Sequence, residues 1–127
     1  ELLADALNAC GPPGVGARPL EQTLPGTSHP CPGVRLDITD PKSLRPVALG
    51  LRLLALLAAL SPRAFRWTPY PTNVHPTGAD HLVRLLGRQD VADRLVEDPR
   101  SVDGEVVEAW TEAQGWWDRA IPYLLYD

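Results

Sequence analysis

Two aspartates, Asp37 and Asp40, have a spacing that could serve acid–base chemistry. Asp37 lies in the alternating segment 34–39, and Asp40 follows that segment directly. In an extended chain three residues span about 10 Å, which is wide enough for the carboxylate pair of an inverting glycosidase. The alternative is structural, with Asp37 facing solvent and Asp40, just before Pro41, capping a turn or a helix. We favour the structural interpretation and expect no catalytic residue in this chain.

The three histidines, His29, His75 and His81, offer little for a metal site. Each is flanked by loop-type residues, and no two have a spacing such as i, i+4 that would bring them to one face of a helix. We therefore expect no metal and no cofactor. His81 stands beside Asp80 near the start of a predicted helix, where it could contact a ligand or be a solvated first-turn residue.

The two cysteines, Cys10 and Cys31, leave two interpretations open. Both lie beside glycine or proline. A disulfide between them would attach the N-terminal loop to the first residue of the main strand in an oxidising compartment. Otherwise they are two unpaired thiols. The cellular location stays open, with an extracytoplasmic one slightly favoured.

The aromatic residues supply the more informative chemistry. Trp67 and Tyr70 lie in a proline-rich loop, with Arg66 adjacent to the tryptophan. Pyranose rings bind by stacking their C–H face on such rings, while the sugar hydroxyls seek Arg, Asp or Asn. A rigid loop that presents these side chains would suit the wall of a saccharide site. The alternative is that Phe65 and Trp67 fold back and plug the end of the sheet.

Length and charge exclude some classes of function. The chain has 127 residues and a net charge of −4, which suits one domain and lacks the basic face that nucleic-acid binding needs. The apolar run 47–60 contains Arg52 and is shorter than the roughly 20 residues of a membrane span. The chain contains no methionine, so we expect Glu1 not to be the native start and the chain to be a piece of a longer protein.

The hydrophobic pattern predicts an α+β fold in a single domain over residues 1–127, in which a small β-sheet carries about four helices packed mainly on one face. The expected elements are a helix at 2–9, an extended segment at 15–22, a strand at 34–39, a long helix entered between Pro41 and Pro46 and ended at Ser61-Pro62, short helices at 80–86 and 91–97, a helix that starts at Asp103, and a strand at 122–126. In the last helix we expect one apolar stripe to face the core, made of Val106, Ala109, Trp110, Ala113 and Trp117.

An ordered set of motifs resembles one known family. The set runs from C-P-G-V-R-L-D-I-T-D at residues 31–40 through R-P-V-x-x-G-L-x-L-L, F-R-W and L-L-G to a terminal P-Y-L-L-Y at 122–126. This order resembles the C-terminal domain of the NamZ-type exo-β-N-acetylmuramidases over nearly the whole chain. The sequence departs from the family's pattern where an aromatic–Asp pair aligns with Leu82-Val83 and where an Arg aligns with Ala92.

The resemblance implies an auxiliary domain that shapes the substrate cleft of a peptidoglycan-processing glycoside hydrolase. The main catalytic carboxylate would lie on an N-terminal Rossmann-like domain of the same polypeptide, the partner would be a muramic-acid-containing saccharide, and this chain alone would be inactive. We expect the saccharide contacts at residues outside the segment 31–60, namely Trp67, Tyr70, Asp80, His81 and Tyr123. The alternative is a non-catalytic carbohydrate- or protein-binding module that shares the fold.

Overall fold

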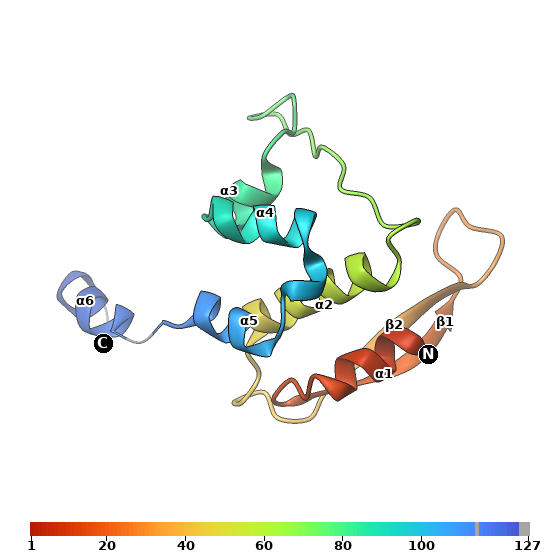
Figure 1. Cartoon of the computed structure of the whole chain (residues 1–127), viewed down its shortest axis with the longest axis horizontal. Coiled ribbons are helices and arrows are strands. Elements are labelled where there is room, and N and C mark those ends of the chain that lie inside the picture. Colours follow the sequence, from red (N-terminus) through yellow and green to blue (C-terminus); the bar gives the residue numbers. More distant parts are fainter. Residues whose placement is uncertain (114, 125–127) are drawn as a thin grey trace.

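The computed structural model describes residues 1–113 and 115–124, apart from the side chain of Trp117. Its elements are, in chain order, α1 (Leu2–Ala9), β1 (Val15–Gln22), β2 (Cys31–Ile38), α2 (Pro46–Leu60), α3 (His81–Leu86), α4 (Gln89–Glu97), the 3-10 turn η1 (Pro99–Ser101), α5 (Gly104–Thr111), α6 (Trp116–Ala120) and the 3-10 turn η2 (Ile121–Tyr123). A small sheet with helices around it confirms the predicted α+β class (Figure 1).

The sheet is a single antiparallel hairpin in the described part of the chain. Strands β1 and β2 pair from Val15 opposite Ile38 to Gln22 opposite Cys31. Strand β2 starts earlier than the sequence pattern predicted, and it includes Pro32. A proline fits there because β2 is an edge strand, where a missing N–H need not break a ladder bond.

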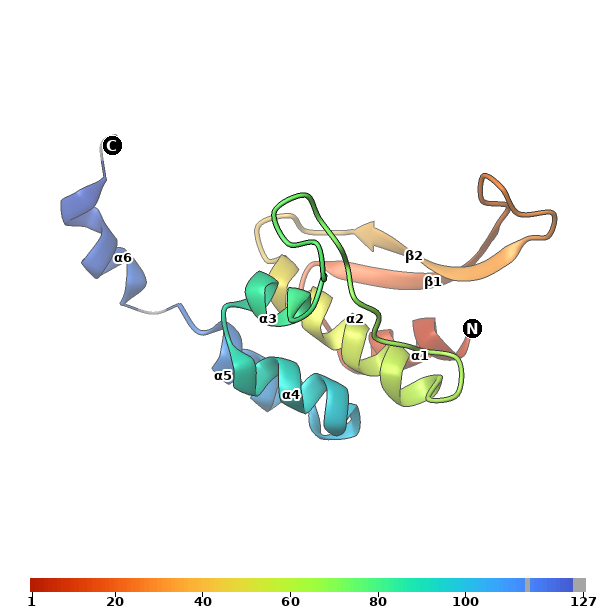
Figure 2. The same ribbon diagram turned by 90° about the horizontal axis from the view of Figure 1, so that it is seen from above.

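Helix α2 lies at the centre of the molecule and separates two apolar clusters. On one side Leu49 packs with Leu7 of α1 and Val15 of β1. On the other side Leu51 packs with Leu95 of α4 and Val107 of α5, a group we call the α2–α4–α5 core. Figures 1 and 2 show α2 between the hairpin with α1 and the group α3–α5. A helix buried on two sides must be apolar almost all round, which explains the run 47–60.

The prediction of one long last helix is wrong. Asp103 does cap a helix, since its side chain accepts a hydrogen bond from the Val106 N–H. However, α5 ends at Thr111, and α6 begins at Trp116 after Gly115 adopts a left-handed φ of 77°. The expected stripe is displaced as a result. Val107 is the fully buried residue of α5, and Ala109 is exposed.

The predicted closing strand is also wrong where the structure describes it. Ile121–Tyr123 form the 3-10 turn η2, and the Leu124 N–H bonds the Ile121 carbonyl. Pro122 favours this outcome because its fixed φ suits a turn and its nitrogen has no proton for a ladder. Residues 125 and 126 lie outside the described part. Figures 1 and 2 show α6 and η2 standing apart from the other helices.

None of the helices in the described ranges combines the length and the apolar character needed to cross a membrane.

Candidate functional site

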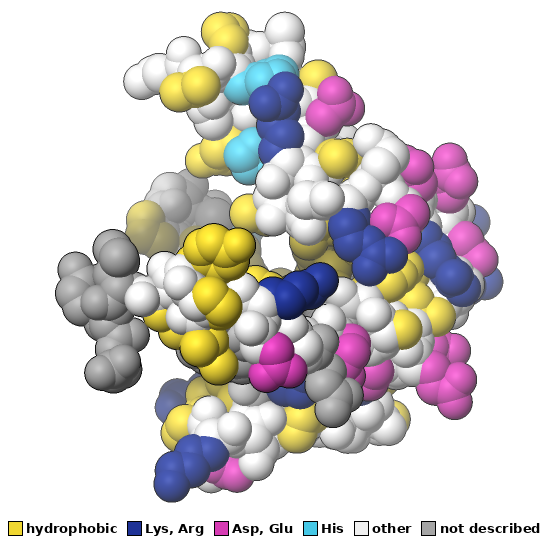
Figure 3. Space-filling view, turned by 90° about the vertical axis from the view of Figure 1, so that its left-hand side faces the viewer, with side chains coloured by type: hydrophobic (Ala, Val, Ile, Leu, Met, Phe, Trp, Pro, Cys, Tyr) yellow, Lys and Arg dark blue, Asp and Glu magenta, His cyan; other side chains and the backbone are white. Residues whose placement is uncertain are grey.

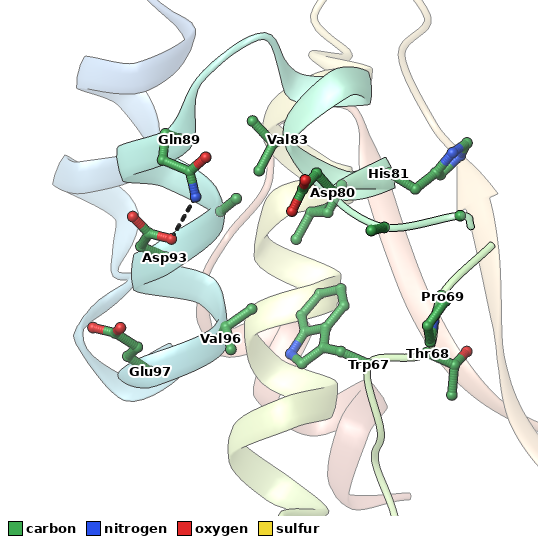
Figure 4. A pocket seen from close by; sticks show the side chains of 14 residues that line it. Trp67, Thr68, Pro69, Asp80, His81, Val83, Gln89, Asp93, Val96 and Glu97 are labelled. Carbon is green, nitrogen blue, oxygen red and sulfur yellow. Dashed lines mark hydrogen bonds between the residues drawn. The ribbon is translucent and has the colours of Figure 1, made fainter. Parts of the chain in front are cut away.

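A cleft of about 290 Å³ opens between the proline-rich loop, the start of α3 and one face of α4. Its lining comes from these three segments: Trp67, Thr68, Pro69, Gly78, Ala79, Asp80, His81, Leu82, Val83, Gln89, Ala92, Asp93, Val96 and Glu97. Figure 4 shows Trp67 at one end, facing Val96 of α4, with Asp80 and Val83 at the other. Three of the five residues predicted to contact a saccharide, Trp67, Asp80 and His81, therefore line one cleft.

The loop that forms one wall is closed by its own backbone. The Tyr70 N–H donates to the Gly78 carbonyl at 3.1 Å, and Thr72 and His75 exchange two backbone hydrogen bonds inside that closure. Gly78 has a φ of +63°, and a Cβ at this position would lie 2.3 Å from the Pro71 nitrogen. Only glycine fits so close a crossing of two backbone segments. The loop is thus ordered without belonging to a helix or a strand.

Tyr70, the fourth predicted contact, does not line the cleft but packs against His81, which does. Their ring centroids are 4.8 Å apart with planes inclined by 45°. Between the loop and α3, Asp80 adopts a left-handed backbone with a φ of 56°. This conformation is uncommon for a residue other than glycine, although Asp tolerates it better than most. It turns the chain directly from the loop into α3.

Trp67 serves both the core and the cleft. The indole is half-buried, packs against the α2–α4–α5 core and meets the Phe65 ring edge-on at 4.9 Å. The two aromatic residues thus fold back as one interpretation expected, but Trp67 covers helices and not the end of the sheet. The surface that remains lines the cleft. Contact on one side fixes the ring, so the other side presents a rigid apolar face.

The polar lining is dominated by acceptors. Asp80, Asp93 and Glu97 contribute carboxylates, and Gln89 donates to Asp93 at 2.7 Å (Figure 4). Across the described residues, the Asp80 carboxylate meets neither a hydrogen-bond donor nor a cation. No Lys or Arg appears among the described residues that line the cleft. Its walls therefore offer one aromatic face, several aliphatic groups and free carboxylate oxygens.

The residues of α4 that line the cleft were not predicted from the sequence, although their spacing could have indicated a polar helix face. Gln89, Asp93 and Glu97 follow one another at intervals of four residues, which places them on one face of a helix. The opposite face carries Val91 and Leu95, which are buried in the α2–α4–α5 core. The polar face is therefore turned away from the core, and only the fold shows that it meets Trp67 across a cleft.

Tyr123, the fifth predicted contact, does not join this cleft. It lies in η2 and is 84% exposed, and the segment that carries it stands apart (Figure 1). Viewed from the side on which α6 projects, hydrophobic side chains gather on the nearest part of the molecule (Figure 3). A saccharide contact at Tyr123 would therefore be separate from the one at Trp67.

Asp37 and Asp40 have structural roles, as we favoured. Asp37 accepts from Arg18 at 2.7 Å and from Arg35 at 2.9 Å, and the Arg18 hydrogen bond is the main cause that lowers the pKa of Asp37. Asp40 accepts from the Ser43 hydroxyl and the Lys42 N–H, which lower its pKa and close a turn. A general acid needs a raised pKa, and these shifts have the opposite sign.

The remaining candidates form no further site in the described residues. Cys10 is exposed, Cys31 is half-buried, and both thiols are free, so the disulfide interpretation does not hold in this structure. His75 bonds the Thr77 hydroxyl inside the loop at 3.1 Å. No group of three His, Cys, Asp or Glu side chains with a geometry for a metal ion occurs in the part of the chain that is described.

An open cleft with one fixed indole face and several acceptors is typical of sites for small polar ligands that also have apolar faces, as saccharides do. The comparison with known families agrees with that class. Residues 1–126 match the family described as exo-beta-N-acetylmuramidase NamZ, C-terminal, and the chain belongs to this family. No curated protein sequence and no solved structure gave a match.

The family gives the coarse function. It is a domain of a peptidoglycan glycoside hydrolase, with a muramic-acid-containing substrate and an N-terminal domain as its partners. Leu82, Val83 and Ala92, at which the resemblance predicted departures from the family's pattern, all line the cleft.

Proposed function

We propose that this chain, as a single domain, forms one side of the substrate cleft of an exo-β-N-acetylmuramidase-type hydrolase. The main catalytic carboxylate would belong to an N-terminal Rossmann-like domain of the same polypeptide. The observation that carries the proposal is the convergence of Trp67, Asp80 and His81 on one cleft. These residues come from a loop and a helix start, and the ring contact between Tyr70 and His81 joins the two segments.

Each group has a distinct role in this proposal. The exposed side of Trp67 stacks on the C–H face of a pyranose ring. The unpaired Asp80 carboxylate accepts hydrogen bonds from sugar hydroxyls, which are good donors to a charged oxygen. Tyr70 and His81, packed on one another, exclude water from one edge of the ring. Together they would supply binding and orientation and leave bond cleavage to the partner domain.

The carboxyl groups whose pKa is shifted are engaged in structural contacts, which fits an auxiliary role. Among the described carboxyl groups whose pKa is shifted, namely Asp37, Asp40 and Asp90, every shift is downward. A glycosidase general acid must be protonated near neutral pH, which requires an upward shift. These three carboxylates are engaged with Arg, Ser or backbone donors instead.

The test is a hydrolysis assay with a chromogenic N-acetylmuramide. The isolated chain should release no chromophore, and the polypeptide that carries both domains should release it. In the two-domain protein, Trp67→Ala should lower kcat/KM by about 5- to 150-fold, because truncating a stacked aromatic costs on the order of 1–3 kcal/mol. Turnover by the isolated chain, or an unchanged kcat/KM in the variant, would overturn the proposal.

A further inference from the structure

The charge of the cleft indicates which sugar it accepts. Its three carboxylates, Asp80, Asp93 and Glu97, face no Lys or Arg among the described lining residues. Of these, Asp93 is satisfied by the Gln89 amide, a neutral donor, so no positive charge offsets it. The site therefore has a negative potential wherever the carboxylates are ionised.

His81 is the one histidine among the described residues that line the cleft, and its ring is directed out of the cleft. Its ring packs against Tyr70, and Figure 4 shows it directed away from Asp80 and Trp67. Arg84, one turn further along α3, is exposed and does not line the cleft. Figure 3 shows histidine and basic side chains together on the outer surface of this region.

We infer that the cleft binds a neutral acetamido sugar and disfavours the muramyl residue, whose 3-O-lactyl group ends in a carboxylate. This inference rests on the proposed function and specifies it. In a glycan that alternates the two sugars, the neutral N-acetylglucosamine lies on Trp67. The muramyl unit then lies outside the cleft, against the partner domain. The chain thus holds the sugar next to the one released.

Two features of the lining fit this occupant. The acetamido sugar offers hydroxyl and amide N–H donors, and the free carboxylate of Asp80 and the carboxylate of Glu97 are acceptors. Its apolar ring face and acetamido methyl group match the indole and the aliphatic groups Ala92 and Val96. A lactyl carboxylate in the same position would meet like charges, which weakens binding by about fivefold for each close pair even in water.

The test compares three probes on the 127-residue chain by NMR. The probes are N-acetylglucosamine, N-acetylmuramic acid and the methyl ester of N-acetylmuramic acid. The readout is the indole N–H signal of Trp67, assigned by its loss in Trp67→Phe. At neutral pH we expect N-acetylmuramic acid to bind at least about 10-fold more weakly than N-acetylglucosamine. The methyl ester keeps the bulk of the lactyl group and removes its charge, so its affinity should be close to that of N-acetylglucosamine.

Variants separate charge from shape. The double variant Asp93→Asn/Glu97→Gln should reduce the difference in affinity between N-acetylmuramic acid and its methyl ester. The control Glu105→Gln, on α5 outside the cleft, should leave that difference in affinity unchanged. Two results would overturn the inference and leave the proposed function standing. One is that N-acetylmuramic acid binds as tightly as N-acetylglucosamine or more tightly. The other is that Arg84→Gln weakens the binding of N-acetylmuramic acid. If no sugar shifts the Trp67 signal, the proposed function fails together with the inference.

Discussion

Tyr70 and His81 pack ring against ring, with centroids 4.8 Å apart, and this contact joins the proline-rich loop to the first residue of α3. The loop brings Trp67 to the cleft from one side, and α3 brings Asp80 from the other. Because the loop has no ladder or helical hydrogen bonds to hold it, its position depends on this ring contact, on the packing of Trp67 against the α2–α4–α5 core and on the closure between Tyr70 and Gly78.

The closure predicts that Gly78→Ala is more damaging than its backbone angle alone explains. Gly78 and Gly11 have nearly the same φ, +63° and +59°. A Cβ at Gly78 would lie 2.3 Å from backbone atoms, whereas a Cβ at Gly11 would have no atom within 4 Å. Gly11→Ala therefore measures the cost of the left-handed conformation, about 1–2 kcal/mol. Gly78→Ala should cost a further 1–3 kcal/mol or so from overpacking. Urea denaturation of both variants measures the difference, and equal midpoints would refute the close crossing.

Trp67 and Trp110 offer a matched pair for separating packing from binding. Both are half-buried and pack against the α2–α4–α5 core, and only Trp67 lines the cleft. We expect Trp67→Phe and Trp110→Phe to lower the free energy of unfolding by similar amounts, about 1–2 kcal/mol each. Only Trp67→Phe should weaken the binding of N-acetylglucosamine, which is followed by the NMR shifts of residues in α4. A loss of binding in both variants would show that the effect is indirect.

The sequence predicted the elements best where one local signal decided them. Helix α3 ends as expected because Gly87 takes the left-handed cap conformation, and α5 begins at its Asp103 cap. The last helix was mispredicted because apolar spacing alone was continued through Glu112, whose backbone is already extended with a ψ of 120°. A separate helix, α6, begins at Trp116.

The cleft itself could be predicted only in part. The types of Trp67, Tyr70 and Arg66 suggested a saccharide wall, and Asp80 was predicted as a separate contact. The fold brings Trp67 and Asp80 to one cleft and packs Tyr70 against His81. The polar face of α4 was not recognised, because a solvated helix face and a cleft wall have the same sequence pattern. What distinguishes them is the folding of the loop over α4, which depends on the crossing at Gly78.

The sheet predicts a pH dependence of stability. The hydrogen bond from Arg18, with help from Arg35, lowers the pKa of Asp37 below its usual 3.8. A lowered folded-state pKa stabilises the protein above the unfolded-state pKa, and this stabilisation is lost as the pH falls through the folded-state value. The wild-type midpoint in urea should therefore decrease more steeply than that of Asp37→Asn below about pH 4. Glu21→Gln, on β1 and without an ion pair in the described residues, is the control. Parallel curves for all three proteins would contradict this role of Asp37.

Glu108 gives the last prediction because it joins Arg45, the N-cap residue of α2, and Arg52 of α2 to α5. It accepts from Arg45 and, at 3.3 Å, from Arg52. The Arg52 side chain is only 11% exposed and also donates to the Cys10 carbonyl at 3.0 Å. This one guanidinium therefore connects the end of α1, the middle of α2 and α5.

Glu108→Gln keeps the shape of the side chain and removes its charge. An exposed ion pair contributes about 0.2–1 kcal/mol, but the loss here should reach about 1–2 kcal/mol because a mostly buried guanidinium loses its counter-charge. Glu105→Gln, on the same helix and exposed, should change the free energy of unfolding by no more than about 0.5 kcal/mol.

In a double-mutant cycle, the effects of Arg52→Gln and Glu108→Gln on the free energy of unfolding should be non-additive, since each removes the same contact. Added salt should reduce the Arg45 contribution, which is exposed to solvent, more than that of Arg52. Additive effects would mean that Glu108 and Arg52 do not couple α2 to α5.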